Sequence, residues 1–304
     1  MNLLAIGVDA GGTSTVAASA VDGVFERSVR SGPANATSLG VASAAATIVA
    51  TVREIAVDRN PAAIVVAAAG AGRESVRGPI LAALRAAFPT TAHASVEDDT
   101  RVALRAGVPT GPGVVVIAGT GSVAYAEHGE RHARVGGAGY LLGDEGSAFA
   151  IGMAALRLLA RRYDERARED ETVALAARTL GAGDRESLLA AIYGAPLDVA
   201  RIASLAPAIV AFAGKGNRAS TKIVQGAAQE LGDLVRAAIA RTELAETSPA
   251  IVFAGGLLHE NSLLSYLLET RVVNETPGAF VVRVREEPAR CALAFAQAAC
   301  VART

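Results

Sequence analysis

The 304-residue sequence has no tryptophan, only two cysteines and an aromatic content of 4%. Its apolar residues, 51% of the chain, are therefore mostly small aliphatic ones, which suit tightly packed layers of helices and strands. Cys291 and Cys300 lie in one apolar stretch, without the spacing of a metal site or a disulfide framework. We interpret them as free thiols buried in a protein of the reducing cytoplasm.

An excess of positive charge is also missing. Lys and Arg number 29 against 30 Asp and Glu, and no basic stripe is present to neutralise a phosphate backbone, so we expect no nucleic-acid partner. The longest uncharged runs, such as 202–214, fall short of the roughly 20 apolar residues of a membrane span, and no basic segment with a cleavage site opens the chain. We expect a soluble cytoplasmic protein without membrane contact.

Two glycine-rich turns, each between apolar strands, organise the chain. Residues 3–21 read as strand, turn and strand, and residues 113–128 repeat that pattern. Helical stripes alternate with buried strands between them, whereas most of 147–247 has helical periodicity, with Ser147 placed to cap its first helix. This predicts an α/β protein of two related domains, 1–110 and 111–304, with a helix-rich second domain and a last helix over 289–301.

The first turn combines Asp9 with Gly11, Gly12 and Thr13. Successive backbone N–H groups in such a turn form a concave nest that binds phosphate, and a carboxylate beside it calls for a divalent cation such as Mg²⁺. A purely structural hairpin turn remains the alternative. The second turn, Gly119-Thr120-Gly121-Ser122, offers the same nest with two hydroxyl groups, and the pairing of the turns favours a nucleotide site.

The segment 136–146 is the most informative, because it contains five glycines with Asp144 and Glu145 directly before a helix start. The helix dipole alone explains one acidic residue at that position. It does not explain the glycines, which indicate a loop that closely approaches a ligand.

Adjacent carboxylates, Asp98 and Asp99, stand at a strand-to-helix junction, where one could cap the helix and the other accept a proton. Gly255 and Gly256 follow a buried strand and could admit an adenine ring or form a simple turn. Two other nucleotide-binding motifs are incomplete in this sequence. Gly70 and Gly72 lack the third glycine of a dinucleotide fingerprint, and Gly214-Lys215-Gly216 lacks the Ser or Thr of a P-loop.

The motifs DAGGTST, AGTGS, GGAGYLLGDEGSA and FAGG together resemble, in order and spacing, the N-acetylglucosamine kinase and bacterial glucosamine kinase family of the sugar kinase and actin-like ATPase superfamily. The resemblance covers essentially the whole chain. It implies two ribonuclease-H-like domains that close over ATP and sugar at an interdomain cleft, with the last helix packing back on the first domain.

The resemblance also implies residue roles. Asp99 matches the catalytic base, which also contacts the substrate, and Asp9 matches the carboxylate associated with Mg²⁺. The remaining matches are the ATP-phosphate contacts Gly11, Gly12, Thr13, Gly119, Thr120 and Gly121, the adenosine contacts Gly216, Gly255 and Gly256, and the sugar contacts Asn35, Gly137, Ala138, Gly139 and Asp144.

Two positions depart from the family pattern. Ala138 stands where the family usually has Trp in a G-G-W-G segment, and Val123 follows the second turn where eukaryotic members often have a polar residue. Both departures leave the identity of the sugar open.

We therefore expect an ATP-dependent kinase that transfers the γ-phosphate to a sugar hydroxyl, at the 6-OH of an amino sugar. One alternative is an ATPase that drives a partner enzyme, as in the related 2-hydroxyacyl-CoA dehydratase activators, although Cys291 and Cys300 do not have the arrangement of iron-sulfur ligands. Another is a non-catalytic sugar sensor. The helix-rich domain offers surface for a homodimer, and no segment of the sequence singles one out.

Overall fold

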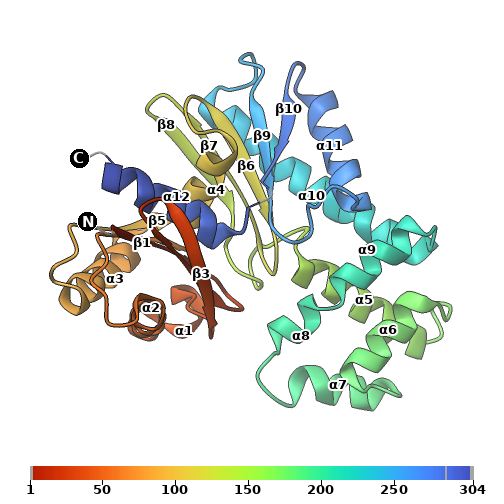
Figure 1. Cartoon of the computed structure of the whole chain (residues 1–304). Coiled ribbons are helices and arrows are strands. Elements are labelled where there is room, and N and C mark those ends of the chain that lie inside the picture. The colour runs from red at the N-terminus through yellow and green to blue at the C-terminus, as the bar shows by residue number, and fades with distance from the viewer. Residues whose placement is uncertain (1–2, 285, 302–304) are drawn as a thin grey trace. The chain divides into compact units, whose positions relative to one another are not determined.

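The computed structural model describes residues 3–284 and 286–301, which form two compact units (Figure 1). The first unit contains the described residues up to Ala106 together with 286–301, and the second runs from Gly107 to Val284. The boundary thus lies slightly before the expected 110/111. The C-terminal segment 286–301 counts with the first unit, on which the resemblance expects the last helix to pack, and the division at 110/111 stays a prediction.

The first unit is built on a five-stranded sheet in the order β3-β2-β1-β4-β5. Its first three strands are antiparallel and its last two are parallel to β1. The strands are β1 (Leu4–Ala10), β2 (Thr15–Val21), β3 (Val24–Ser31), β4 (Ala63–Ala68) and β5 (His93–Asp98), and the helices are α1 (Ala36–Leu39), α2 (Val41–Ala56), α3 (Glu74–Ala87), α4 (Asp99–Gly107) and α12 (Pro288–Val301).

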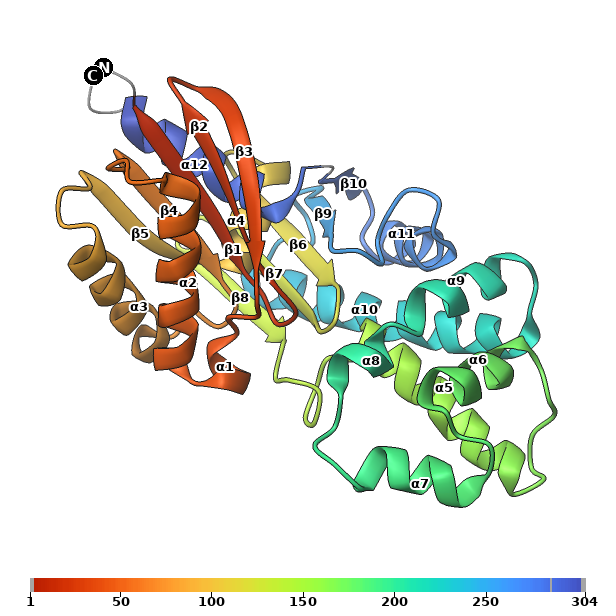
Figure 2. The ribbon, with the colours of Figure 1, turned by 60° about the horizontal axis from the view of Figure 1, so that its bottom comes forward.

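Helices cover both faces of this sheet, as Figure 2 shows for α2 and α3 on one side and α12 on the other. Side chains alternate along β1, so Ile6 and Val8 join the core that includes Ile48 of α2. At Gly7 a side chain would face the other side of the sheet, where α12 packs. A Cβ built on Gly7 would lie 2.0 Å from the backbone nitrogen of Leu293. The close approach of α12 to β1 therefore depends on the absence of a side chain at Gly7.

The second unit repeats the topology of the first. Its sheet has the order β10-β9-β6-β7-β8, with β6, β7 and β8 antiparallel and β9 and β10 parallel to β6. The strands are β6 (Gly113–Ala118), β7 (Ser122–His128), β8 (Arg131–Gly136), β9 (Ala250–Ala254) and β10 (Phe280–Arg283). The expected α/β architecture of two related domains is confirmed, and each domain is built on a five-stranded sheet.

Between β8 and β9 the second unit inserts six helices, which makes it the helix-rich one. They are α5 (Ala148–Tyr163), α6 (Glu171–Leu180), α7 (Arg185–Tyr193), α8 (Val199–Ala203), α9 (Ala206–Gly214) and α10 (Arg218–Thr242), and α11 (Leu263–Glu275) follows β9. As expected, Ser147 caps α5, because its side chain accepts the Ala150 N–H at 3.1 Å. α10 packs along β6, β7 and β8 and buries Ala227, Leu231 and Ala238.

Within the described residues, no single helix is long and apolar enough to cross a membrane, and the stretch 199–242 reaches that length only as two parts bent by 112°.

Candidate active site

The first glycine-rich turn joins β1 to β2. The Gly11 N–H donates to the Ser14 carbonyl at 3.1 Å, and the Gly11 carbonyl accepts the Ala34 N–H at 3.1 Å. In a trans peptide the C=O and the following N–H point in opposite directions, so the Gly12 N–H points away from Ala34. Gly12 and Thr13 are exposed. The turn therefore presents backbone donor groups on an open side.

The second turn joins β6 to β7 and is built in the same way. The Gly119 N–H donates to the Gly121 carbonyl at 2.9 Å. The Gly119 and Thr120 carbonyls accept the N–H groups of Ala148 at 2.9 Å and Phe149 at 3.3 Å, both in the first turn of α5. The N–H groups of Thr120 and Gly121 consequently point away from α5, as a phosphate nest requires.

The two turns are therefore equivalent. In each, the first glycine bonds to the far side of its own turn, and its carbonyl accepts an N–H from the segment that follows the three-stranded meander: Ala34 in the first unit and Ala148 in the second. The two units therefore share the hydrogen-bond pattern of their glycine-rich turns as well as the topology of their sheets.

Asp9 lies near the end of β1, beside the first turn, in register with Val16 on β2 and Ala67 on β4. Burial raises the pKa of Asp9 to about 6, and the nearby positive charge of Arg30 opposes that rise. Arg30 also donates from Nη1 to the Ser14 hydroxyl at 2.7 Å. The motifs of the sequence do not single out Arg30. Its position near Asp9 follows from the pairing of β3 with β2, where Arg30 lies opposite Val16.

The surroundings of Asp9 fit the Mg²⁺ that the resemblance implies. Mg²⁺ in nucleotide sites takes one or two carboxylates and completes its shell with phosphate oxygens and water. No group of three or more His, Cys, Asp or Glu suited to a metal occurs in the part of the chain that the structure describes. A single carboxylate next to a phosphate nest matches a cation held mainly by the nucleotide. The role of Asp9 stays a prediction.

The adjacent carboxylates at the end of β5 have different surroundings. Asp98 accepts the Gly72 N–H at 3.0 Å and the Thr100 N–H at 3.0 Å, and it also accepts the Thr100 hydroxyl. Asp99 begins α4 and accepts the Thr100 N–H at 2.9 Å. Asp98 thus ties β5 to the loop after β4, and the role of Asp99 as a base stays a prediction.

Register places these acids at the same sheet edge as the first turn. Ala10, Ala68 and Asp98 are paired in one row across β1, β4 and β5. Parallel strands carry ligands at their carboxyl ends, and two strand spacings separate β1 from β5 by about 10 Å. Asn35 also lies near the first turn, because its Nδ2 would be 3.7 Å from a Cβ on Gly12. The first unit therefore gathers Asp9, Asn35 and Asp99 around the turn or its edge.

The loop 136–147 contacts the second turn through Asp144. The Asp144 Oδ1 accepts the Ser122 N–H at 3.3 Å, and a Cβ on Gly121 would lie 2.8 Å from the other carboxylate oxygen. Burial raises the pKa of Asp144, against the lowering effect of the Ser122 N–H. Gly137 and Gly139 have left-handed backbones, with φ of 68° and 84°, and Ala138 is exposed between them.

Gly255 and Gly256 lie at the carboxyl end of β9, next to the strand that enters the second turn. The Leu257 N–H donates to the Ala118 carbonyl at 3.1 Å, one residue before Gly119. A Cβ on Gly255, whose φ is 92°, would lie 2.4 Å from that same carbonyl oxygen. The backbone packing alone therefore requires glycine at 255, whereas nothing lies within 4 Å of a Cβ on Gly256.

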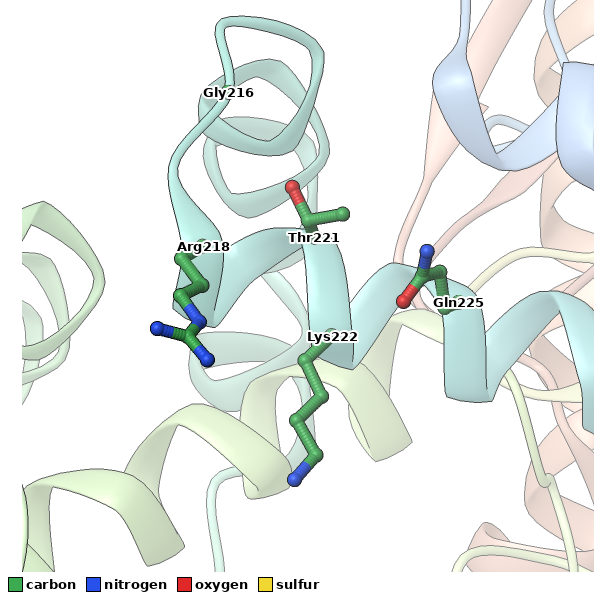
Figure 3. A pocket seen from close by; sticks show the side chains of 5 residues that line it. All are labelled: Gly216, Arg218, Thr221, Lys222 and Gln225. Carbon is green, nitrogen blue, oxygen red and sulfur yellow. The ribbon is translucent and has the colours of Figure 1, made fainter.

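Gly216 takes no part in these contacts. It lines a pocket of about 490 Å³ at the start of α10, together with Arg218, Thr221, Lys222 and Gln225. Figure 3 shows Arg218 and Lys222, one helical turn apart, projecting to the same side of α10. The predicted adenosine contact of Gly216 is therefore separate from the hydrogen bond between Leu257 and Ala118 beside Gly255, and it stays a prediction.

Two relatives with assigned activities match about two thirds of the chain. An N-acetylmuramic acid/N-acetylglucosamine kinase of Clostridium acetobutylicum is 28% identical over 206 residues, 67% of each chain. An N-acetyl-D-glucosamine kinase of Dictyostelium discoideum is 29% identical over 198 residues, which is 64% of this chain and 62% of that protein. The match thus spans less than two thirds of the second relative.

Solved structures share the fold over nearly the whole chain. A Chromobacterium violaceum protein described as a candidate N-acetylglucosamine kinase superposes with a TM-score of 0.74 at 22% identity, covering 96% of this chain and 98% of that one. A Streptomyces griseus ROK family glucokinase, solved with glucose and AMPPNP, gives 0.59 at 18% identity, covering 97% and 99%. These likenesses confirm the expected sugar-kinase, actin-like ATPase fold.

The family model that describes the BadF/BadG/BcrA/BcrD ATPases matches residues 6–294. The match includes both glycine-rich turns, Asp9, Asp99 and the Gly255-Gly256 segment, and with the two kinase relatives it confirms the resemblance stated from the sequence. The chain belongs to the BadF/BadG/BcrA/BcrD ATPase family.

Proposed function

We propose that this chain is an ATP-dependent kinase that phosphorylates an amino sugar, at the 6-OH of N-acetylglucosamine, glucosamine or a close derivative. The observation that carries the proposal is the placement of Asp99, at the same sheet edge as the phosphate-type turn of the first unit. The names of both curated relatives, which are sugar kinases, support the same activity.

In the proposed reaction, Asp99 accepts the proton of the attacking sugar hydroxyl as that oxygen bonds to the γ-phosphorus of ATP, and ADP leaves. Phosphoryl transfer needs mainly positioning and charge neutralisation, with one carboxylate to accept the proton. Asp99 is the residue that the resemblance assigns to this role, and Asp98 beside it accepts the N–H groups of Gly72 and Thr100.

The two turns are the proposed phosphate-binding elements. Gly12 and Thr13 in the first unit and Thr120 and Gly121 in the second would donate to phosphate oxygens, since the carbonyls of Gly11, Gly119 and Thr120 are held on the opposite side. Gly11 and Gly119 donate their own N–H groups within the turns, and as glycines they would let the phosphate approach the backbone closely. Asp9 would hold Mg²⁺, which when bound neutralises charge on the phosphates. Gly216, Gly255 and Gly256 are the proposed adenosine contacts.

On the sugar side we propose Asn35 and Asp99 in the first unit and Gly137, Ala138, Gly139 and Asp144 in the second. Ala138 is exposed in a loop whose flanking glycines adopt left-handed backbones. A small residue there leaves room beside the sugar, so the substrate class extends to amino sugars with a bulky substituent. N-acetylmuramic acid, named for the Clostridium relative, is one such sugar.

An assay of ADP release across glucosamine, N-acetylglucosamine, N-acetylmuramate and glucose tests the proposal. We expect at least one amino sugar to accelerate ADP release strongly, with stoichiometric sugar phosphate. ADP release that no sugar changes would replace the kinase with a partner-driving ATPase. Absence of nucleotide binding in calorimetry, with and without Mg²⁺, would leave only a non-catalytic sugar-binding role.

A further inference from the structure

The carboxylate of Asp144 contacts the backbone of the second phosphate turn. Its Oδ1 accepts the Ser122 N–H at 3.3 Å, and its Oδ2 occupies the space that a side chain on Gly121 would need, 2.8 Å from the position of a Cβ. A residue 22 positions further along the chain thus fills the face of the turn that glycine leaves open.

A second bond ties the same two segments together. The Ser122 hydroxyl, on a buried residue, donates to the Glu145 carbonyl at 2.6 Å. Ser122 therefore contacts the loop twice, through its N–H to Asp144 and through its hydroxyl to Glu145. The turn and the loop 136–147 are joined side by side within the second unit.

The backbone of Asp144 indicates that this arrangement is imposed by its contacts. Its φ is 60°, in the left-handed region that non-glycine residues rarely adopt, although Asp and Asn tolerate it better than most. Such a conformation persists where the surroundings over-determine it. The bonds to Ser122 on one side and the start of α5 on the other supply that constraint.

The carbonyls of the turn are held from the opposite side. Ala148 and Phe149 donate to the carbonyls of Gly119 and Thr120, which directs the N–H groups of Thr120 and Gly121 outward. Asp144 fixes the downstream end of the same turn at Gly121 and Ser122. A turn held at both ends keeps its donor groups pre-oriented, which lowers the ordering cost of binding phosphate.

We propose that Asp144 is a positioning residue for the second phosphate turn: its carboxylate holds Gly121 and Ser122 so that the turn binds nucleotide phosphate, whether or not sugar is present. The inference rests on the proposed nucleotide role of that turn. It assigns to Asp144 a function that a contact with sugar alone would not provide.

The test measures the dissociation constant of a non-hydrolysable ATP analogue with Mg²⁺ by calorimetry, without sugar. Asp144→Gly removes the carboxylate and suits a φ of 60°, so the backbone is not strained. Asp144→Asn keeps an oxygen that can accept the Ser122 N–H. Glu145→Gln is the matched control, because the structure uses the backbone carbonyl of Glu145 and its side chain is exposed.

Asp144→Gly should weaken analogue binding by about tenfold or more, as expected for the loss of a hydrogen bond to a charged group. Asp144→Asn should recover wild-type affinity or exceed it, because it also removes a negative charge close to the phosphates. Glu145→Gln should bind like the wild type. If Asp144→Gly does not unfold cooperatively on heating, Asp144→Ser replaces it with the same expectation.

Wild-type analogue affinity in Asp144→Gly would overturn the inference and leave the kinase proposal intact. Equal weakening in Glu145→Gln would also overturn it, since a general disturbance of the loop would then be responsible. If the wild type binds neither ATP analogue nor ADP, the proposed function fails, and the inference fails with it for that separate reason.

Discussion

The carboxylate of Asp98 accepts the backbone N–H of Gly72 at 3.0 Å, and this bond distinguishes Asp98 from its neighbour Asp99. Gly72 has no room for a side chain, because a Cβ on it would lie 2.8 Å from the Asp98 carboxylate. The bond links the end of β5 to the loop that follows β4, on the edge that carries the proposed active site.

Replacing Asp98 by Ala should destabilise the protein, because the N–H groups of Gly72 and Thr100 lose an acceptor. The expected loss in the free energy of unfolding is about 1–3 kcal/mol, measured by denaturant titration. The control is Glu97→Gln, which removes only the partly exposed ion pair with Arg101 and should cost under about 1 kcal/mol. An equal effect of the two changes would contradict the structural role of Asp98.

Replacing Asp99 by Asn should lower kcat by about a hundredfold or more, because a general base acts in the chemical step. The KM for ATP should stay close to that of the wild type, and so should the melting temperature. Steady-state kinetics with the sugar found active in the ADP-release assay make the measurement. Turnover of Asp99→Asn near the wild-type level would remove Asp99 from the mechanism. The control Glu97→Gln should keep wild-type turnover.

The raised pKa of Asp9 predicts a conflict between stability and function. Below its ordinary pKa of 3.8, Asp9 is protonated in both the folded and the unfolded chain. As pH rises towards about 6, the unfolded chain releases the proton first, so the folded state loses stability across that interval and does not regain it above. Asp9→Asn should therefore raise the melting temperature at pH 7.5 in EDTA and change it little at pH 4.

The same substitution should reduce kinase activity, because an amide does not replace a carboxylate beside Mg²⁺ and the phosphates. Without bound Mg²⁺, Asp9 takes up a proton as pH falls below about 6, so the apparent affinity for Mg²⁺ should weaken as pH falls through that value. A melting temperature that Asp9→Asn lowers at pH 7.5 would contradict the burial argument. Full activity of this variant at all Mg²⁺ concentrations would contradict the metal role.

The two turns could be predicted from the sequence because they are local. Gly, Asp and Thr interrupt runs of β-branched and small apolar residues within about ten positions, and this pattern alone defines strand, turn and strand. The equivalence of the turns also followed from the sequence. Their hydrogen bonds to Ala34 and Ala148 did not, because each depends on where the chain returns after a three-stranded meander.

The contacts that sequence reasoning left open are long-range. From the residues alone Asp98 and Asp99 were equivalent candidates, and only the resemblance selected Asp99. The bond between Asp98 and Gly72 spans 26 positions and could not be predicted from the local pattern. Arg30 was missed because its effect on Asp9 arises from the pairing of β3 with β2. Asp144 was assigned from the resemblance to a sugar contact, and its bond to Ser122 depends on the path of a loop with several left-handed residues.

The packing of α12 on β1 gives a prediction about stability. Gly7→Ala would place a methyl group 2.0 Å from the Leu293 nitrogen, so α12 must move or the strand must shift. Overpacking of this kind typically costs about 1–3 kcal/mol, measured as the free energy of unfolding. Gly32→Ala is the control, because nothing lies within 4 Å of its added Cβ. Equal stability of the two variants would contradict the close packing of α12.

Ala138 offers a test of the sugar side. A tryptophan at this exposed position would restore the large ring usual in the kinase family that the sequence resembles, and it would fill space beside the proposed sugar site. Ala138→Trp should lower kcat/KM for N-acetylmuramate, which carries a bulky 3-O-lactyl group, by more than it lowers kcat/KM for N-acetylglucosamine. Assays in which the two sugars compete give the ratio of their kcat/KM values directly.

The matched control for this prediction is Leu142→Trp, which adds a similar ring to the same loop at a side chain that is 84% exposed. It should leave the ratio of the two kcat/KM values unchanged, because an exposed ring has no bound substituent to displace. A ratio that Ala138→Trp also leaves unchanged would show that position 138 does not border the sugar. The free energy by which one pocket wall distinguishes substrates of different size is modest, about 1–3 kcal/mol. We therefore expect Ala138→Trp to change the ratio of the two kcat/KM values by between about 10-fold and 200-fold.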